Sequence, residues 1–182
     1  MRSEIRLSGS GGQGIILASI IMAEALFEDG KHVAQTQVYG PEARGSVCKA
    51  ELVISDVNIT YKKALHPEFL MSLTGEALNE YKNDLAENAV ILIDDSIESL
   101  ISKSIYEKYK VYKAPIIKSC KEEMNNMISV NIVALGAANH LMGFSSKDSL
   151  RNSVRRYVPK DSADKNIKAL NIGENLQLSQ VN

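Results

Sequence analysis

The chain has 182 residues, of which 45% are hydrophobic and 24% charged, and its formal net charge is −1. This composition predicts a single globular domain over residues 1–182 with a sizeable apolar core. A nearly neutral chain has no electrostatic basis for general nucleic-acid or membrane binding, and no apolar run reaches the roughly 20 residues of a membrane span. Two separated cysteines, Cys48 and Cys120, favour a reducing, cytoplasmic setting over a disulfide framework.

A glycine-rich turn at residues 9–14, with the sequence GSGGQG, stands between an apolar strand at 5–7 and an apolar helix at 15–27. It fits the G-x-G-x-x-G pattern in the strand–turn–helix context that this pattern requires. Glycine permits positive φ and close approach to a ligand, and the first N–H groups of a helix attract anions. The turn therefore predicts phosphate or anion binding. The candidate binding residues of the turn are Gly9, Gly11, Gly12, Gln13 and Gly14.

Two other interpretations of the turn remain open, a purely structural turn that packs the helix on the strand and a dinucleotide site. A site for NAD needs an acidic residue about 20 positions beyond the glycines to hold the ribose. Residues 33–37 read VAQTQ in that region and contain neither an acid nor an arginine. The sequence therefore disfavours NAD(P) or FAD and favours contact with an anion.

The helix at 15–27 is apolar almost all round, since Ser19 and Glu24 are its polar positions. A surface helix normally shows one apolar stripe, so this one is expected to be buried on two sides. A sheet covers one side. The second cover is either another layer of this chain or a partner subunit, which admits a homodimer of the isolated chain.

Strands and helices alternate along the rest of the chain, and helices gather towards its end. The expected strands are 32–38, 47–54, 59–61, 69–73, 89–93 and 110–114. The expected helices are 75–83, 98–109, 121–126, 131–142, 147–158 and 161–170. This order predicts an α/β fold: one mixed sheet flanked by helices, with a Rossmann-like β-turn-α unit at the N-terminus and a helical C-terminal portion.

Catalytic and metal-binding patterns are missing from the sequence. Its three histidines have no further metal ligand at metal-site spacing, and two cysteines do not suffice for an iron–sulfur cluster, which usually takes four. Neither a nucleophile elbow nor a P-loop is present. Asp94 and Asp95 follow an apolar strand and are interpreted as a strand-end turn rather than a metal site. We therefore expect no catalytic residue and no metal ligand in this chain.

The glycine turn followed by QVYGPEARG at 37–45 resembles the gamma subunit of the 2-oxoacid:ferredoxin oxidoreductases. Similar to that family's C-terminal pattern are N-x-x-A-L-G at 131–136, V-P-K at 158–160, K-N at 165–166 and A-L at 169–170. The resemblance thus covers nearly the whole chain. The YGPEARG form looks most like the 2-oxoglutarate branch, with the branched-chain branch close behind. Ser46 stands where the family commonly has a second glycine.

The resemblance implies a role within a larger enzyme. Such enzymes decarboxylate a 2-oxoacid on thiamine diphosphate, pass electrons through iron–sulfur clusters to ferredoxin and transfer the acyl group to coenzyme A. It implies that thiamine diphosphate and the clusters bind to alpha, beta and delta-type partner subunits, and that this chain holds no cofactor tightly. This chain is expected to pack against those subunits and to help form the coenzyme A approach, with Arg44 and Gly45 joining the glycine turn as candidate contacts.

Two alternatives to this hypothesis stay open. A stand-alone nucleotide-binding enzyme of the Rossmann type would explain the glycine turn alone. A purely structural assembly module would explain the all-round apolar helix and the alanine-rich helix at 131–142.

Overall fold

In the computed structural model, which describes residues 2–39 and 46–181, seven strands form one sheet in the order β2-β3-β1-β4-β5-β6-β7. The strands are β1 (Arg2–Ser10), β2 (His32–Tyr39), β3 (Val47–Ser55), β4 (Phe69–Ser72), β5 (Val90–Asp94), β6 (Lys110–Ala114) and β7 (Ser179–Val181). Strands β1, β4, β5 and β6 run parallel, whereas β3 is antiparallel to both β1 and β2, and β7 is antiparallel to β6. The expected α/β fold with a mixed sheet is confirmed.

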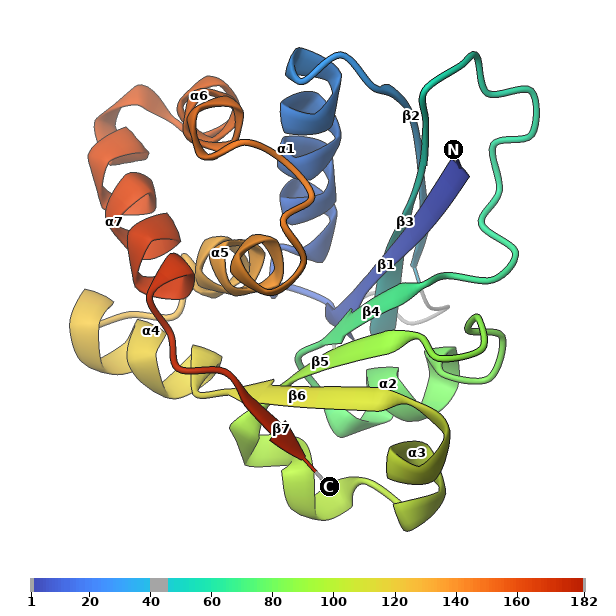
Figure 1. Cartoon of the computed structure of the whole chain (residues 1–182). Coiled ribbons are helices and arrows are strands. Elements are labelled where there is room, and N and C mark those ends of the chain that lie inside the picture. The colour runs from blue at the N-terminus through green and yellow to red at the C-terminus, as the bar shows by residue number, and fades with distance from the viewer. Residues whose placement is uncertain (1, 40–45, 182) are drawn as a thin grey trace.

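Helices cover both faces of the sheet (Figure 1). The α-helices are α1 (Ile15–Glu28), α2 (Gly75–Tyr81), α3 (Lys103–Lys108), α4 (Ile116–Met124), α5 (Val130–Met142), α6 (Lys147–Tyr157) and α7 (Ala163–Glu174). The 3-10 helices are η1 (Asp95–Leu100) and η2 (Lys160–Ser162). Helices α1, α4, α5, α6 and α7 lie on one face, and α2, α3 and η1 lie on the other (Figure 1). The helical C-terminal portion therefore forms most of one layer.

Each face of the sheet has its own hydrophobic core, because successive side chains of a strand point to opposite faces. In β4, Phe69 and Met71 belong to the core under α1 and α5, whereas Leu70 belongs to the core under α2 and α3. The run from Val90 to Ile93 is apolar on both faces for the same reason, as parallel central strands are.

Helix α1 receives its second cover from this chain. It packs on β2 and β3 and, on its other side, against α6 and α5. Arg156 of α6 pairs with Glu24 and, at 2.8 Å, with Glu28 of α1. Phe27 is the exception, with 67% of its surface exposed. The predicted burial on two sides is confirmed, and another layer of the chain provides it.

Helices α5 and α7 cross at two glycines, Gly136 and Gly173. A Cβ added at Gly173 would overlap the carbonyl oxygen of Val133, and one at Gly136 would overlap that of Leu170. Only glycine permits such close contact of two backbones. This crossing places α5, and therefore the start of α5 at Val130, in a fixed position relative to the rest of the helical layer.

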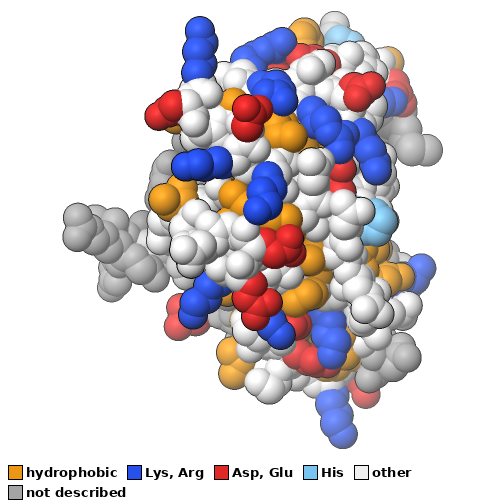
Figure 2. Space-filling model, turned by 90° about the vertical axis from the view of Figure 1, so that its left-hand side faces the viewer, with side chains coloured by type: hydrophobic (Ala, Val, Ile, Leu, Met, Phe, Trp, Pro, Cys, Tyr) orange, Lys and Arg blue, Asp and Glu red, His pale blue; other side chains and the backbone are white. Residues whose placement is uncertain are grey.

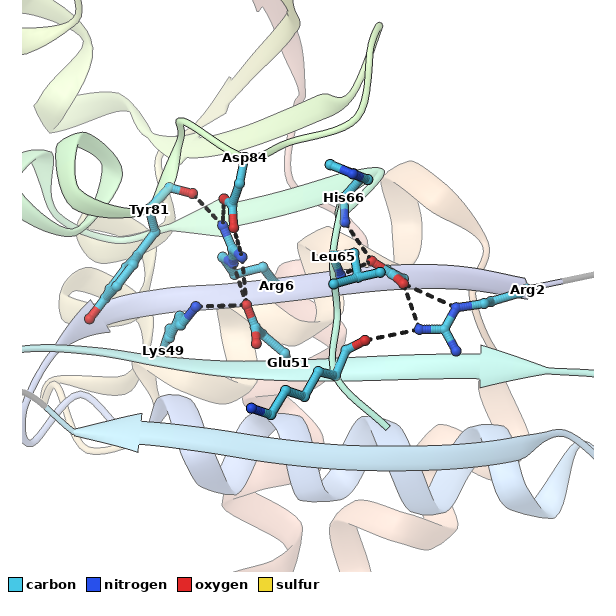
Figure 3. A network of polar contacts seen from close by, with 10 residues as sticks. Arg2, Arg6, Lys49, Glu51, Leu65, His66, Tyr81 and Asp84 are labelled. Atoms are coloured by element: carbon cyan, nitrogen blue, oxygen red, sulfur yellow. Dashed lines mark hydrogen bonds and ion pairs between the residues drawn. The ribbon is translucent and has the colours of Figure 1, made fainter. Parts of the chain in front are cut away.

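A buried ionic network lies on the α2 face of the sheet (Figure 3). Arg6 of β1 is 1% exposed; its Nε donates to Glu51 Oε1 at 2.7 Å and its Nη2 to Asp84 Oδ2 at 2.8 Å. Its Nη1 donates to the carbonyl oxygen of Tyr81 at 2.6 Å, and Lys49 Nζ donates to Glu51 at 2.9 Å. The hydrogen bond from Arg6 lowers the pKa of Asp84. This network explains how β3 buries the charged residue Glu51.

The sequence-based element boundaries need four corrections. Residues 59–61 are not a strand, because Arg2 donates to the carbonyl oxygens of Tyr61 and Lys63 and Glu4 accepts from the backbone of Leu65 and His66, so side chains replace a strand partner. The predicted helix 98–109 is divided into η1 and α3. Helix α4 begins directly after Pro115, earlier than predicted, and the sequence analysis missed β7.

The surface of the helical layer carries mixed charges. Lys and Arg side chains alternate there with Asp, Glu and hydrophobic groups, without a field of one sign on the face that Figure 2 shows. Among residues 2–39 and 46–181, none of the helices combines the length and the apolar character needed to cross a membrane.

Candidate functional site

The glycine turn lies at the end of β1, and the helices that follow β1 and its neighbouring strand β4 pack on opposite faces of the sheet. From β1 the chain passes through α1 on one face of the sheet, whereas from the neighbouring strand β4 it passes through α2 on the opposite face (Figure 1). In open α/β sheets, ligands bind in the crevice outside the carboxyl ends of strands at such a point. The turn follows the carboxyl end of β1 and therefore occupies the expected position for a ligand.

Hydrogen bonds within the turn fix its shape. The backbone N–H of Ser10 donates to Gln13 Oε1 at 2.7 Å, and the backbone N–H of Gln13 donates to the Ser10 carbonyl at 3.1 Å. Gly9 is buried beneath this arrangement, since a Cβ there would lie 2.5 Å from Gln13 Oε1. Gly11 and Gly12 are exposed, and Gly12 has a φ of 92° with nothing within 4 Å of an added Cβ. The predicted binding residues thus form a packed base at Gly9 and an open tip at Gly11 and Gly12.

Helix α1 begins at this turn without a side-chain cap. Its N-cap residue is Gly14, with φ 73° and ψ 22°, and the first turn of the helix contains no acidic residue. The first backbone N–H groups of an α-helix have no partner within the helix, and the helix dipole adds partial positive charge there. The backbone N–H groups at this end of α1 can therefore donate hydrogen bonds to an anion.

Asn131 contacts the turn from the start of α5. Its Nδ2 donates to the carbonyl oxygen of Gly14 at 3.1 Å, and the backbone N–H of Ala18 donates to the same oxygen at 3.0 Å. Asn131 is 3% exposed. The sequence analysis did not name it as a site residue, although an Asn in an otherwise apolar helix and its place in the N-x-x-A-L-G pattern were available signals.

A pocket of about 300 Å³ adjoins α1 and the start of α5. Its lining consists of Leu17, Met124, Asn126, Ile128, Ser129, Asn131, Val158, Pro159, Ser162, Lys165 and Asn166. Ser129 Oγ donates to Asn166 Oδ1 at 3.1 Å, and Asn166 Nδ2 donates to the Ser162 carbonyl at 3.0 Å. The structure thereby gathers the separated C-terminal segments of the resemblance, at 131–136, 158–160 and 165–166, around one pocket.

Arg44 and Gly45, the two candidate contacts from the second motif, lie outside the described residues. The residue that follows them, Ser46, accepts a hydrogen bond from the Gly11 N–H at 2.9 Å. Strand β3 also pairs with β1 directly beside the turn, with Val47 opposite Ser10. Ser46, which directly follows the second motif in the sequence, therefore contacts the exposed tip of the glycine turn.

Other polar and thiol groups singled out in the sequence have structural surroundings. Asp94 is fully buried, and its carboxylate accepts from the backbone of Ser96 at 3.1 Å and of Ile117 at 2.8 Å, so it caps both η1 and α4. Cys48 and Cys120 are buried free thiols, and burial raises the pKa of each. Within residues 2–39 and 46–181, no three His, Cys, Asp or Glu side chains gather as potential metal ligands.

The family of the chain follows from comparison with known proteins. A family model described as pyruvate ferredoxin/flavodoxin oxidoreductase matches residues 4–176. The chain belongs to this family. The matched region runs from within β1 to just beyond α7 and so includes the glycine turn and the pocket.

Similar proteins place the chain more closely within the family. The 2-oxoglutarate synthase subunit KorC of Methanocaldococcus jannaschii is 43% identical over 175 residues, which cover 95% of this chain and 92% of that protein. The gamma subunit of a keto/oxoacid ferredoxin oxidoreductase from Geobacter sulfurreducens PCA is 39% identical, with a TM-score of 0.84 over 95% of this chain and 94% of that one. The resemblance seen in the sequence is confirmed: the chain is a gamma-type subunit of the 2-oxoacid:ferredoxin oxidoreductases, most like the 2-oxoglutarate synthase subunits.

The same fold also occurs within a longer polypeptide. The structure of 2-oxoglutarate:ferredoxin oxidoreductase from Magnetococcus marinus with 2-oxoglutarate, coenzyme A and succinyl-CoA bound has a TM-score of 0.84 to this chain. At 23% identity, the match covers 95% of this chain and 30% of that one. A unit with this fold can thus be one part of a larger oxidoreductase chain.

Proposed function

We propose that this chain serves a 2-oxoglutarate:ferredoxin oxidoreductase, in which a 2-oxoacid is oxidatively decarboxylated to its acyl-CoA and electrons pass to ferredoxin. The substrate assignment is supported by the names of the similar KorC proteins and by the YGPEARG form of the second motif. Residues 1–182 act as one gamma-type domain, in the cytoplasm, and the isolated chain is inactive.

The reactive centres belong to partners in this proposal. Alpha, beta and delta-type subunits hold thiamine diphosphate and the iron–sulfur clusters, because this chain offers neither a cysteine set nor, among its described residues, a gathering of potential metal ligands. When bound, thiamine diphosphate supplies the decarboxylation chemistry. This chain contributes subunit packing and part of the approach for coenzyme A.

One observation carries the coenzyme A assignment: α1 starts without a side-chain cap at an exposed glycine turn located at a switch point of the sheet. Coenzyme A is rich in phosphate, and backbone N–H groups at a helix start donate well to phosphate oxygens. Gly11 and Gly12 leave room for close approach, while the Gln13 side chain holds the turn open by bonding Ser10. Arg44 and Gly45 complete the contact from the second motif by adding a charge-assisted hydrogen bond.

The test compares two variants of one residue in the complex reconstituted with its partner subunits. Gly12→Asp and Gly12→Asn both place a side chain at a position with positive φ, which Asp and Asn tolerate better than most other residues. The two variants differ in one negative charge. We expect Gly12→Asp to raise the KM for coenzyme A about fivefold over Gly12→Asn, because a like charge near a phosphate costs about 1 kcal/mol in a water-exposed site. Equal KM values for the two variants would contradict a role of the turn in the coenzyme A approach.

Two controls separate the competing functions. A stand-alone nucleotide-binding enzyme requires micromolar binding of NADH or NADPH by the purified chain, which titration measures. The proposed subunit role requires coenzyme A-dependent 2-oxoglutarate oxidation to appear only when the partner subunits are added, and robust activity of the chain alone would contradict it.

A further inference from the structure

We infer that Asn131 is a positioning residue for the glycine turn: its side chain sets the first turn of α1 in the orientation that receives the anionic ligand. The inference rests on the proposed function for the identity of that ligand, coenzyme A. It adds a residue from a different part of the chain, because Asn131 and Gly14 are separated by 117 positions.

The contact leaves little freedom to either partner. A Cβ at Gly14 would lie 2.6 Å from Asn131 Nδ2 and 2.8 Å from Asn131 Cγ, so the amide lies directly on the backbone of the N-cap residue. Gly14 is in the left-handed region, and as the N-cap residue it joins the turn to the helix. The hydrogen bond from Asn131 therefore acts on the residue at which the turn passes into the first turn of α1, where backbone N–H groups lack partners within the helix.

Asn131 is itself held from the core. It lies one position after the start of α5, and α5 is held against α7 through the glycine crossing at Gly136 and Gly173. A buried amide with 3% exposure also has a strong demand for hydrogen-bond partners. The packing of α5 against α7 fixes Asn131, and the hydrogen bond from Asn131 in turn fixes the backbone of Gly14 relative to the core.

If Asn131 only stabilised the fold, its replacement would affect the turn no more than replacement of another buried Asn in α5. The same helix contains such a residue, which serves as a matched control. Asn139, in the same helix and 6% exposed, donates from Nδ2 to the Ser145 carbonyl at 3.0 Å and accepts from the Ser145 N–H at 2.9 Å. Replacement of either Asn by Leu keeps the approximate shape and adds no charge. Asn139→Leu removes two hydrogen bonds at the other end of α5, so it tests general destabilisation at least as severely.

The experiment measures amide hydrogen exchange in the full chain and kinetics in the reconstituted complex. Asn131→Leu should speed exchange of the Ala18 amide about fivefold and raise the KM for coenzyme A about fivefold with kcat changed less than about twofold, the effect of one lost hydrogen bond. Asn139→Leu should leave both quantities near their wild-type values. If Asn131→Leu fails to fold, Asn131→Ser, which retains a hydroxyl donor, is used in its place with Asn139→Ser.

The outcomes separate this inference from the proposed function. Faster Ala18 exchange in Asn131→Leu alone supports positioning, even if the Gly12→Asp and Gly12→Asn variants show equal KM values and the coenzyme A assignment fails. Wild-type exchange and KM in Asn131→Leu, or equal changes in the Asn139→Leu control, overturn the positioning role whatever the Gly12 pair shows.

Discussion

Gly12 at the exposed tip of the glycine turn and the two glycines of the α5–α7 crossing use the absence of a side chain in opposite ways. At the turn, Gly12 is exposed and has nothing within 4 Å of an added Cβ, so the space beside its backbone is open to a ligand. At the crossing, the space beside Gly136 and Gly173 is filled by the backbone of the facing helix. Glycine thus gives access in one region and tight packing in the other, and only the first region is free to serve function.

The largest effect is expected at the crossing. Gly173→Ala should destabilise the chain by about 3 kcal/mol or more, because its Cβ overlaps the Val133 carbonyl and helix backbones cannot move aside cheaply. The same change at Gly12 should cost only about 1 kcal/mol, from backbone conformation alone. Urea unfolding of both variants measures the difference, and similar midpoints would show that the two regions do not differ as described.

The buried ionic network under the turn-bearing strand should give the next largest effect. Arg6→Met leaves Glu51 without its main partner and should cost about 2 kcal/mol, reduced from the cost at a fully buried pair because Asp84 is half exposed. Thermal unfolding checks this. Arg6→Met combined with Glu51→Leu should recover part of the loss, whereas a further equal loss would show that the charges act independently.

A smaller effect is expected at the far end of α1, where the C-cap residue Asp29 is firmly bonded. Burial would raise the pKa of Asp29, but hydrogen bonds from Ser145, Ser149 and Ser146 outweigh it and lower the pKa from 3.8 to about 2. A lowered carboxylate pKa gives stability that is complete above about pH 4 and lost as the pH falls towards 2. This exposed group should contribute about 1 kcal/mol after allowance for solvent screening.

Comparison of Asp29→Asn with the wild type tests that expectation. The Tm difference between them should be largest near pH 7 and should shrink between pH 4 and pH 2, since protonation removes the advantage of the carboxylate. A difference that stays constant over this range would mean that Asp29 stabilises the chain without its charge.

The sequence predicted the elements whose signals are local. Helix α1 can be predicted because its apolar run is followed by Gly30, strand β6 because Pro115 stops it, and the glycine turn because its glycine spacing is contiguous. Two of the failures involve distant partners. The false strand at 59–61 depends on Arg2, and the short strand β7 has too few apolar residues to be recognised before its pairing with β6 is known.

The candidate site follows the same division. Its glycines could be predicted from spacing, and their separation into a buried Gly9 and an exposed tip could not, because that depends on where the Gln13 side chain folds. The role of Asn131 also lay beyond the sequence, since periodicity does not show which buried amide reaches a carbonyl 117 positions away. Polar side-chain contacts, rather than apolar patterning, therefore account for these two features of the site that the sequence did not predict.

We propose above that the open tip of the glycine turn forms part of the coenzyme A approach. The most direct measurement is the ratio of the coenzyme A KM values of Gly12→Asp and Gly12→Asn in the reconstituted complex. The account predicts a ratio of about five with nearly equal kcat values. A ratio of one, with both variants fully assembled, would contradict it.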